Sequence, residues 1–353
     1  MLSTLASNAI LSKAHAMYGR RLTEQNYKDL LNCQSVAEVA SYLKNHTAYK
    51  QVLAGVNENS LHRGQLEAKL KQKQLEDYAS LCRYEVSVGE YFSGYLLIRS
   101  EIEQILHSIT LMSAGKPEEY LFSMPMYLSQ HTHINLQSLA EIKTFDDLLN
   151  ALDHTPYRKL LEPLKPMNGN APNYTEIENA LYTYLYTWIF SIIDKYTKGE
   201  TSKQLRNIFV SVIDLTNYSH IVRLKASYHV DPESIRSMLL PYGSLKPRIL
   251  SQLLEAETES EVSALMKQTP VGKQWLDIDS SYVDEIPKRA LYEICRHNIY
   301  FSRNPSVVMM SYTFLLQSEI TDIVTIVEGV RYKLPAAEIA KLLIVYNYKE
   351  RSN

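Results

Sequence analysis

Apolar residues recur along this chain with the spacing of one face of an α-helix. The clearest stretches are Ile98–Ile109, Leu181–Ile192 and Leu316–Val327, in which apolar side chains return every three or four residues. This interval matches the 3.6-residue turn of an amphipathic helix. No stretch shows the sustained apolar–polar alternation between hairpin turns that is typical of strands. The pattern therefore predicts an all-α fold.

The sequence also predicts longer helices and the places where some helices start. Long helices are predicted at Leu61–Cys82, Ile177–Tyr196 and Ile286–Ser302. Proline suits the first position of a helix, and acidic residues just after it complement the helix dipole. Helices starting near proline are therefore predicted at Lys116-Pro117, Asp231-Pro232 and Leu334-Pro335, where successive prolines lie 115 and 103 residues apart.

One segment occurs three times in the chain. The copies are SVAEVASYLKNHTAYKQVL from Ser35, TFDDLLNALDHTPYRKLL from Thr144 and TESEVSALMKQTPVGKQWL from Thr258. The shared threonines Thr47, Thr155 and Thr269 lie 108 and 114 residues apart. In the second and third copies threonine precedes proline, which predicts that the side chains of Thr155 and Thr269 cap a helix whose first position is proline. The first copy has Ala48 in place of that proline.

A period near 110 residues gives each unit enough chain to form its own core. We therefore expect three similar helical domains, at residues 1–121, 122–236 and 237–353. Each contains a helix with a polar residue four positions before an isoleucine, at Glu101/Ile105, Asn217/Ile221 and Glu319/Ile323. The alternative is that helical sequences look alike because they share composition. The constant order of these markers argues against it, as does the Thr-Pro-x-x-Lys sequence common to the second and third copies.

Composition restricts the class of protein. Of the 353 residues, 22% are charged and 45% hydrophobic, and the net charge is −2. These values are typical of a soluble globular protein and give no general footprint for nucleic acid or anionic lipid. The three cysteines, Cys33, Cys82 and Cys295, are too few and too scattered for a disulfide framework, so reduced thiols in a cytosolic protein are expected. The first residues lack the basic region of a secretory signal, and none is expected.

No membrane span is expected either. The longest charge-free run, Tyr120–Ala140, contains many polar residues. The more apolar stretches Asn179–Ile193 and Asn304–Ser318 are shorter than the roughly 20 residues that a spanning helix needs.

Motifs that carry chemistry are scarce. The sequence contains no phosphate-binding glycine loop, no H-E-x-x-H and no C-x-x-C. The pairs His131/His133 and Cys295/His297 resemble metal ligands, but two residues apart on a helix do not face each other. Structural or surface roles are the favoured interpretation.

Two adjacent aspartates can be compared with an enzyme motif. Asp146-Asp147 resembles the aspartate-rich motif of all-α prenyl-transferring enzymes, but Leu148-Leu149-Asn150 follows and the completing carboxylate is missing. A solvated helix face is the favoured interpretation. The sequence therefore predicts no catalytic, cofactor-binding or metal-ligating residue, and it predicts no cofactor.

Two compositional features leave alternatives open. The chain has 26 tyrosines against 7 phenylalanines. Tyrosine suits both a helical core and a partner-facing surface, because it combines a large apolar ring with one polar group. The charged segment Arg63–Asp77 is interpreted as a solvated helix face, with a docking role as the alternative.

Several segments together resemble one known family. They are Tyr18–Thr23, Tyr27-x-x-Leu30-Leu31, Tyr42-Leu43 with Thr47-x-Tyr49, Pro241–Leu245 and Val327–Pro335. In their order and spacing they look like the C subunit of bacterial and archaeal V-type (A-type) ATPases, a family that includes the d subunit of eukaryotic vacuolar ATPases. The resemblance covers essentially the whole chain.

The resemblance implies a funnel-shaped, all-helical body of three domains about a pseudo-threefold axis. Such a non-catalytic central-stalk (rotor) subunit seats the central shaft of the soluble ATPase head on the proteolipid ring. It passes torque for ATP-coupled proton or sodium transport, and it is cytoplasmic and peripheral to the membrane. No contact residue can be transferred from the family, so none is named. The alternatives are a three-domain α-helical scaffold with other partners and, more remotely, an all-α metal-dependent lyase or transferase.

Overall fold

The computed structural model describes residues 2–58, 61–84, 89–166, 171–228, 230–276 and 283–348. All regular secondary structure in these ranges is helical, which confirms the all-α prediction. The chain divides into two compact units. Unit 1 combines Met1–Leu97, Glu119–Thr132 and Cys295–Asn353, and unit 2 combines Ile98–Glu118 and His133–Ile294.

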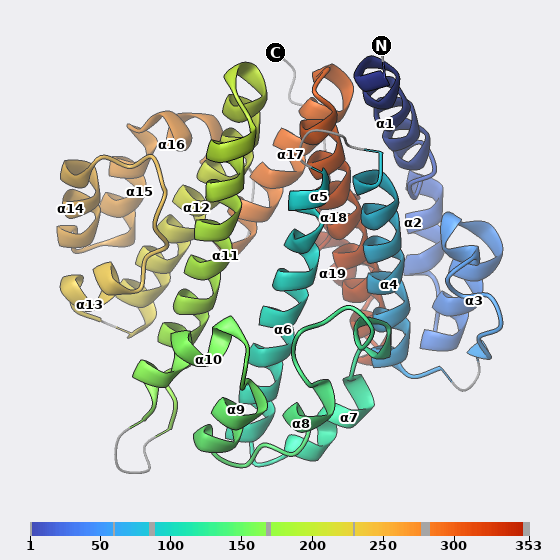
Figure 1. Ribbon diagram of the computed structural model, residues 1–353, viewed down its shortest axis with the longest axis horizontal. Coiled ribbons are helices and arrows are strands. Elements are labelled where there is room, and N and C mark those ends of the chain that lie inside the picture. The colour runs from blue at the N-terminus through green and yellow to red at the C-terminus, as the bar shows by residue number, and fades with distance from the viewer. Residues whose placement is uncertain are drawn as a thin grey trace. The chain divides into compact units, whose positions relative to one another are not determined.

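Unit 1 is built around one long buried helix, α18 (Pro305–Arg331), which lies beside α1 and α4 (Figure 1). Its other elements are α1 (Leu2–Tyr18), α2 (Glu24–Leu31), α3 (Val36–His46), η1 (Ala48–Lys50), α4 (Arg63–Cys82), α5 (Gly89–Phe92), α7 (Tyr120–Ser123), η4 (Met126–Leu128) and α19 (Ala336–Lys341). Most residues of α18 are buried. Its own apolar side chains lie on all sides of the helix instead of along one stripe, which is typical of an interior helix. The apolar stretch Asn304–Ser318 therefore forms the start of an interior helix.

Unit 2 contains the two helices α11 and α12, which pack on each other. Its elements are α8 (Leu136–Leu139), α9 (Phe145–Ala151), α10 (Pro156–Leu161), η5 (Glu162–Leu164), α11 (Tyr174–Tyr196), α12 (Gly199–Tyr228), α13 (Pro232–Ser237), α14 (Pro247–Glu255), α15 (Glu259–Lys267), α16 (Pro270–Trp275) and η6 (Val283–Glu285). Helices α15 and α16 pack on α12, and α10 packs on α11. The division between the units falls within α6 (Gly94–Ser113), η3 (Pro117–Glu119) and α17 (Ile286–Phe301).

The predicted helix starts are confirmed where proline occupies the first turn. Pro156, Pro232 and Pro270 begin α10, α13 and α16. Pro117 begins the short 3₁₀ turn η3, and Pro335 lies one residue before α19 as its N-cap. The fixed φ angle of proline and its missing N–H are compatible with all of these positions.

Tyrosines make a large contribution to the cores of both units. Five of the largest fully buried side chains are tyrosines, at positions 27, 49, 78, 120 and 157. Others, including Tyr300 and Tyr332, are exposed. The core interpretation holds for the first group, and the exposed tyrosines leave the partner-surface alternative open.

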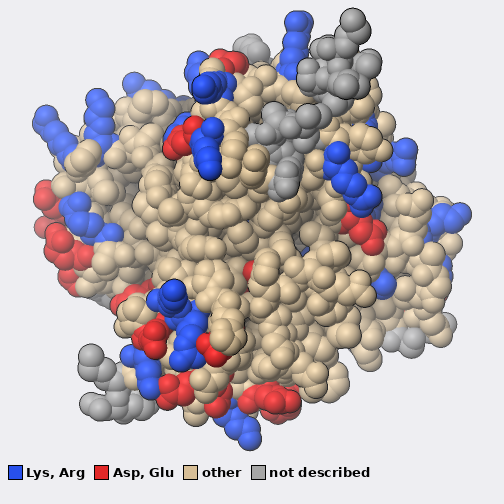
Figure 2. Space-filling view, in the orientation of Figure 1, with Lys and Arg blue, Asp and Glu red and all other residues tan. Residues whose placement is uncertain are grey.

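The charged segment Arg63–Asp77 lies in α4, one side of which is buried through Leu66, Leu70 and Gln74. Several of its charged residues pair with one another, as in the ion pair between Lys73 and Asp77 at 2.6 Å. On the face drawn in Figure 2, basic and acidic residues are interspersed around the surface. This face shows no broad field of one sign of the kind that binds nucleic acid.

Candidate functional site

The polar residue that precedes isoleucine by four positions in each predicted repeat makes the same kind of contact. These residues are Glu101, Asn217 and Glu319. All three are buried on the long helices α6, α12 and α18. A side-chain oxygen of each accepts a backbone N–H from a distant segment. The pairs are Glu101 Oε1 with His133 (2.7 Å), Asn217 Oδ1 with Leu240 (2.8 Å) and Glu319 Oε2 with Leu22 (2.7 Å). We call these three residues the junction acceptors.

Each junction acceptor holds the start of the chain that leads into a copy of the repeated segment. Leu22 precedes the copy at Ser35, His133 the copy at Thr144, and Leu240 the copy at Thr258. The acceptor and its partner belong to successive predicted repeats, and Glu319 of the third pairs with Leu22 of the first. The Glu319 contact lies within unit 1, and the other two lie within unit 2.

The repeated segment supplies a second donor in two of the three cases. The Tyr49 hydroxyl donates to Glu319 Oε1 at 2.8 Å, and the Tyr157 hydroxyl donates to Glu101 Oε2 at 2.6 Å. These tyrosines occupy equivalent positions, two residues after the shared threonine. Each carboxylate thereby receives a donor on both oxygens, which a buried charge requires.

At Asn217, both the acceptor and the residue equivalent to the tyrosine differ from those at Glu101 and Glu319. Val271 stands where the others have tyrosine, and the acceptor is Asn217. The Asn217 Nδ2 donates to the Leu240 carbonyl at 2.9 Å, while its Oδ1 accepts from the Leu240 N–H. One residue's backbone thus satisfies the neutral amide, and no tyrosine is needed. The paired change has a direct reason in hydrogen bonding.

Burial changes the ionisation of the Tyr49 and Glu319 pair. Desolvation raises the pKa of Glu319, although the hydrogen bonds from Leu22 and Tyr49 work in the opposite direction. Desolvation and then the neighbouring Glu319 carboxylate raise the pKa of Tyr49 well above its ordinary value. Tyr49 therefore remains a protonated donor throughout the physiological range. The pair is a fixed structural contact in which Tyr49 does not act as a base.

The shared threonines behave differently from one another. The Thr269 hydroxyl accepts from the Gly272 N–H at 2.9 Å and donates to the Met266 carbonyl at 2.7 Å, so the predicted cap is present. Thr155 occupies the N-cap position, but its hydroxyl only donates to the Leu152 carbonyl, at 2.6 Å. The predicted side-chain cap at Thr155 was therefore wrong. The hydroxyl satisfies a carbonyl at the end of the preceding helix instead.

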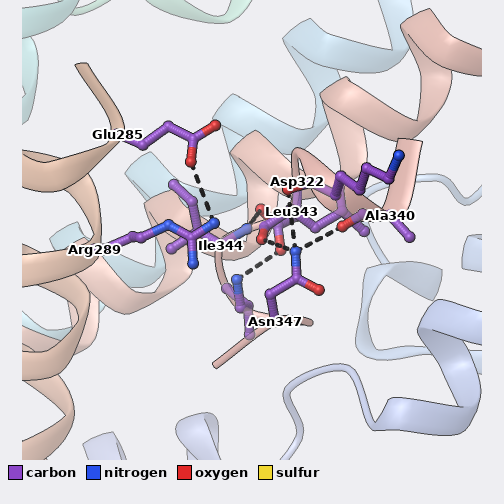
Figure 3. Close-up of polar contacts among 9 residues, drawn as sticks. Glu285, Arg289, Asp322, Ala340, Leu343, Ile344 and Asn347 are labelled. Carbon is purple, nitrogen blue, oxygen red and sulfur yellow. Dashed lines mark hydrogen bonds and ion pairs between the residues drawn. The ribbon is translucent and has the colours of Figure 1, made fainter. Parts of the chain in front are cut away.

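Asp322 forms a further buried contact on α18, which the sequence analysis missed (Figure 3). Asp322 Oδ1 accepts from the Ile344 N–H and Oδ2 from the Val345 N–H, both at 2.8 Å. Asn347 Nδ2 donates to the carbonyls of Ala340 (2.7 Å) and Leu343 (2.8 Å). Burial raises the pKa of Asp322 to about 7 despite the backbone donors. This carboxylate fixes the chain that follows α19. The sequence did contain a signal for this buried contact, namely an acidic residue within a largely apolar helix.

Unit 2 contains a comparable clamp at one of the segments that suggested the family. Asp214 Oδ1 accepts from the Ser244 N–H at 2.8 Å, and Oδ2 accepts from the Ser244 hydroxyl at 2.5 Å. The adjacent Gly243 lies so close that a Cβ there would overlap Asp214 Oδ1. The Pro241–Leu245 segment thus has a packing reason for its glycine.

The residues weighed as metal ligands are dispersed or engaged. His131 is exposed, whereas the His133 ring lies 3.3 Å from Glu101 and its backbone N–H donates to the same carboxylate. Cys295 is fully buried, and desolvation raises the pKa of its thiol. The His297 ring packs on the Phe301 ring with centroids 4.8 Å apart.

The Asp146-Asp147 pair serves local structure. Asp147 accepts the Thr144 N–H at 2.9 Å, while the Thr144 hydroxyl accepts the Asp147 N–H at 3.1 Å. This capping box begins α9. Asp146 forms an ion pair with Lys165 at 2.6 Å. The two side chains have separate structural partners.

Within the part of the chain that the structure describes, no three histidine, cysteine, aspartate or glutamate side chains gather as a metal site would require. Over the same residues, none of the helices combines the length and apolar character needed to span a bilayer. Four buried carboxylates of the described residues each accept a hydrogen bond from a backbone N–H: Glu101, Asp214, Glu319 and Asp322.

Comparison with known proteins identifies the family. The family model for the ATP synthase (C/AC39) subunit matches residues 10–342. Three archaeal relatives are each the C subunit of an A-type ATP synthase. The one from Thermococcus onnurineus is 23% identical over 316 residues, covering 87% of this chain and 81% of the relative. The one from Pyrococcus horikoshii is 21% identical over 340 residues, covering 94% and 88%. The one from Pyrococcus furiosus is 23% identical over 260 residues, covering 71% and 68%. Because the family model spans nearly the whole sequence, this chain belongs to the ATP synthase (C/AC39) subunit family.

Proposed function

We propose that this chain is a non-catalytic central-stalk subunit of a V-type or A-type rotary ATPase or ATP synthase. In this role it seats the coiled-coil shaft of the soluble head on the proteolipid ring of the membrane sector. It then passes torque between them during ATP-coupled proton or sodium transport. The family membership carries this proposal. The expected location is cytoplasmic and peripheral to the membrane, through protein partners.

We propose further that the body consists of three related repeats, at residues 1–121, 122–236 and 237–353, about a pseudo-threefold axis in a funnel-like arrangement. The junction acceptors support this architecture, because one hydrogen-bonding arrangement recurs at equivalent positions. The first and second repeats, and the second and third, are covalently continuous, and Glu319 ties the third to the first through Leu22. A chain tied in this way resists twisting, which suits a subunit that transmits torque.

The experiment is affinity purification of the tagged chain from detergent-solubilised membranes. We expect the shaft subunits and the proteolipid ring to co-purify with it, and the shaft alone to co-purify from cells that lack the ring. A scaffold with unrelated partners would bring neither. In membranes without this chain, ATP hydrolysis by the head should continue while ion pumping stops. Pumping that persists at the normal rate would contradict the proposal.

A further inference from the structure

One connection between repeats is longer than its counterpart and carries exposed apolar side chains. Glu101 and its partner His133 are 32 residues apart, whereas Asn217 and Leu240 are 23 residues apart. Most of the extra length lies between the helix-starting proline and the donor residue. Pro117 precedes His133 by 16 residues, whereas Pro232 precedes Leu240 by 8. The extra chain includes α7 and η4, which pack against α4 within unit 1 (Figure 1).

This extra segment is firmly held. Tyr120 and Leu128 are completely buried and anchor it at both ends. Between them Leu121, Phe122 and Met126 are 53%, 82% and 66% exposed. Large exposed apolar side chains on a segment that is anchored at both ends are typical of an interaction site.

A groove of about 380 Å³ lies beside these side chains. The α4 side of the groove runs from Gly64 to Gln72, a rise of about 12 Å or two helical turns. Phe122, Met124 and Met126 line the facing side. Methionine is flexible and polarisable, so this wall can adapt to apolar side chains of different shapes.

Among the described residues that line the groove, Lys69 alone is charged. Its Nζ donates to the Gln72 amide oxygen at 3.1 Å and forms no ion pair with a carboxylate of the described residues. The neighbouring cations differ: Arg63 and Lys71 both pair with Glu67. An apolar groove with one such cation complements an apolar ligand that carries a carboxylate.

We propose that this groove binds an amphipathic α-helix of another protein, with apolar residues facing Phe122 and Met126 and a carboxylate facing Lys69. A groove that follows α4 for two turns fits the helix-in-groove mode of recognition, in which apolar residues at i, i+4 and i+7 act as anchors. None of the three junction acceptors is among the described residues that line the groove. It is carried by a segment that has no counterpart of equal length in the second connection.

The test uses the full chain and two fluorescein-labelled helical peptides of about 16 residues, long enough to hold helical structure. Both peptides carry one leucine stripe, and they differ only in a glutamate or a lysine at its edge. Fluorescence anisotropy should show saturable binding with preference for the glutamate peptide. Phe122→Ser should weaken binding about tenfold, the effect of losing one well-packed anchor. Lys69→Glu should reverse the preference between the peptides.

Phe301→Ser is the matched control, because Phe301 is also in unit 1 and 72% exposed but does not line the groove. It should leave binding unchanged. Absence of saturable binding, equal binding of the two peptides, or equal effects of Phe122→Ser and Phe301→Ser would overturn the proposal. So would sedimentation of the chain as a dimer that Phe122→Ser dissociates, because the groove would then bind a second copy.

Discussion

Tyr49 and Glu319 are 270 residues apart in the sequence, and the tyrosine hydroxyl donates a 2.8 Å hydrogen bond to the glutamate carboxylate. Both side chains are buried. The contact joins the first copy of the repeated segment to the last long helix. An equivalent bond joins Tyr157 to Glu101. The same residue types therefore recur in the same roles, which is stronger support for internal repetition than sequence similarity alone.

Tyr49→Phe removes the donor to Glu319 Oε1 and changes little else in volume. We expect a loss of about 1–3 kcal/mol in the free energy of unfolding, the usual consequence of leaving a buried acceptor unsatisfied. Urea denaturation followed by circular dichroism measures it. Tyr332→Phe is the control, since Tyr332 is 66% exposed, and should stay within about 0.5 kcal/mol of the original chain. Equal stability of the two variants would contradict the role of the Tyr49 bond.

Asn217→Asp tests why the third junction differs. The change removes the Nδ2 donor and places a carboxylate 2.9 Å from the Leu240 carbonyl, with Val271 unable to donate in its place. We expect a loss of about 1–3 kcal/mol in the free energy of unfolding. Asn135→Asp should be nearly neutral, because Asn135 caps α8 with its side-chain oxygen and aspartate caps equally well. A neutral Asn217→Asp would show that an acid is tolerated without tyrosine.

The buried Asp322 should make stability depend on pH. Burial raises its pKa to about 7 in the folded chain from an ordinary value of 3.8, so the folded state binds more protons between these values. Stability from this group is complete below about pH 4 and falls as the pH rises towards 7. The free energy of unfolding of the original chain, minus that of Asp322→Asn, should therefore decrease across this window. Urea titrations at about pH 5, 6, 7 and 8 measure it, and a constant difference would count against the assignment.

The helices could be predicted from the sequence because their causes are local. The apolar period indicated α11, and the prolines at Pro156 and Pro270 indicated two helix starts within the repeated segment. These signals act over a few residues. The fold class needed nothing further.

The partners of the junction acceptors could not be predicted, because they are far away in the chain. Glu319 finds Leu22 at a separation of 297 residues, and no local rule connects them. The sequence still held a usable signal: Glu319 and Asp322 interrupt an apolar helix at positions three apart, on one side. Polar residues so placed are buried and need donors, although the sequence does not say which.

The shared threonines should contribute unequally. Thr269 both accepts from Gly272 and donates to Met266, whereas Thr155 only donates to Leu152. Replacement by alanine should cost about 2 kcal/mol at Thr269 and about 1 kcal/mol at Thr155. Denaturation midpoints of the two variants make the comparison directly. A larger loss at Thr155 would mean that its contact to the preceding helix matters more than a complete cap.

Gly272 is the position in the repeated segment where a single methyl group should do most harm. A Cβ there would overlap the Met266 carbonyl oxygen and lie 2.9 Å from the Lys267 nitrogen, both backbone atoms that cannot move without distorting the end of α15. Gly272→Ala should therefore destabilise by about 3 kcal/mol, the upper part of the range for overpacking. Gly64→Ala is the matched comparison, because its Cβ would meet nothing closer than 3.6 Å and α4 gains a better helix former. We expect it to stabilise by about 0.5–1 kcal/mol. Thermal denaturation of both variants measures the two effects, and a loss at Gly272 no larger than the change at Gly64 would show that the close contact at Gly272 does not control packing there.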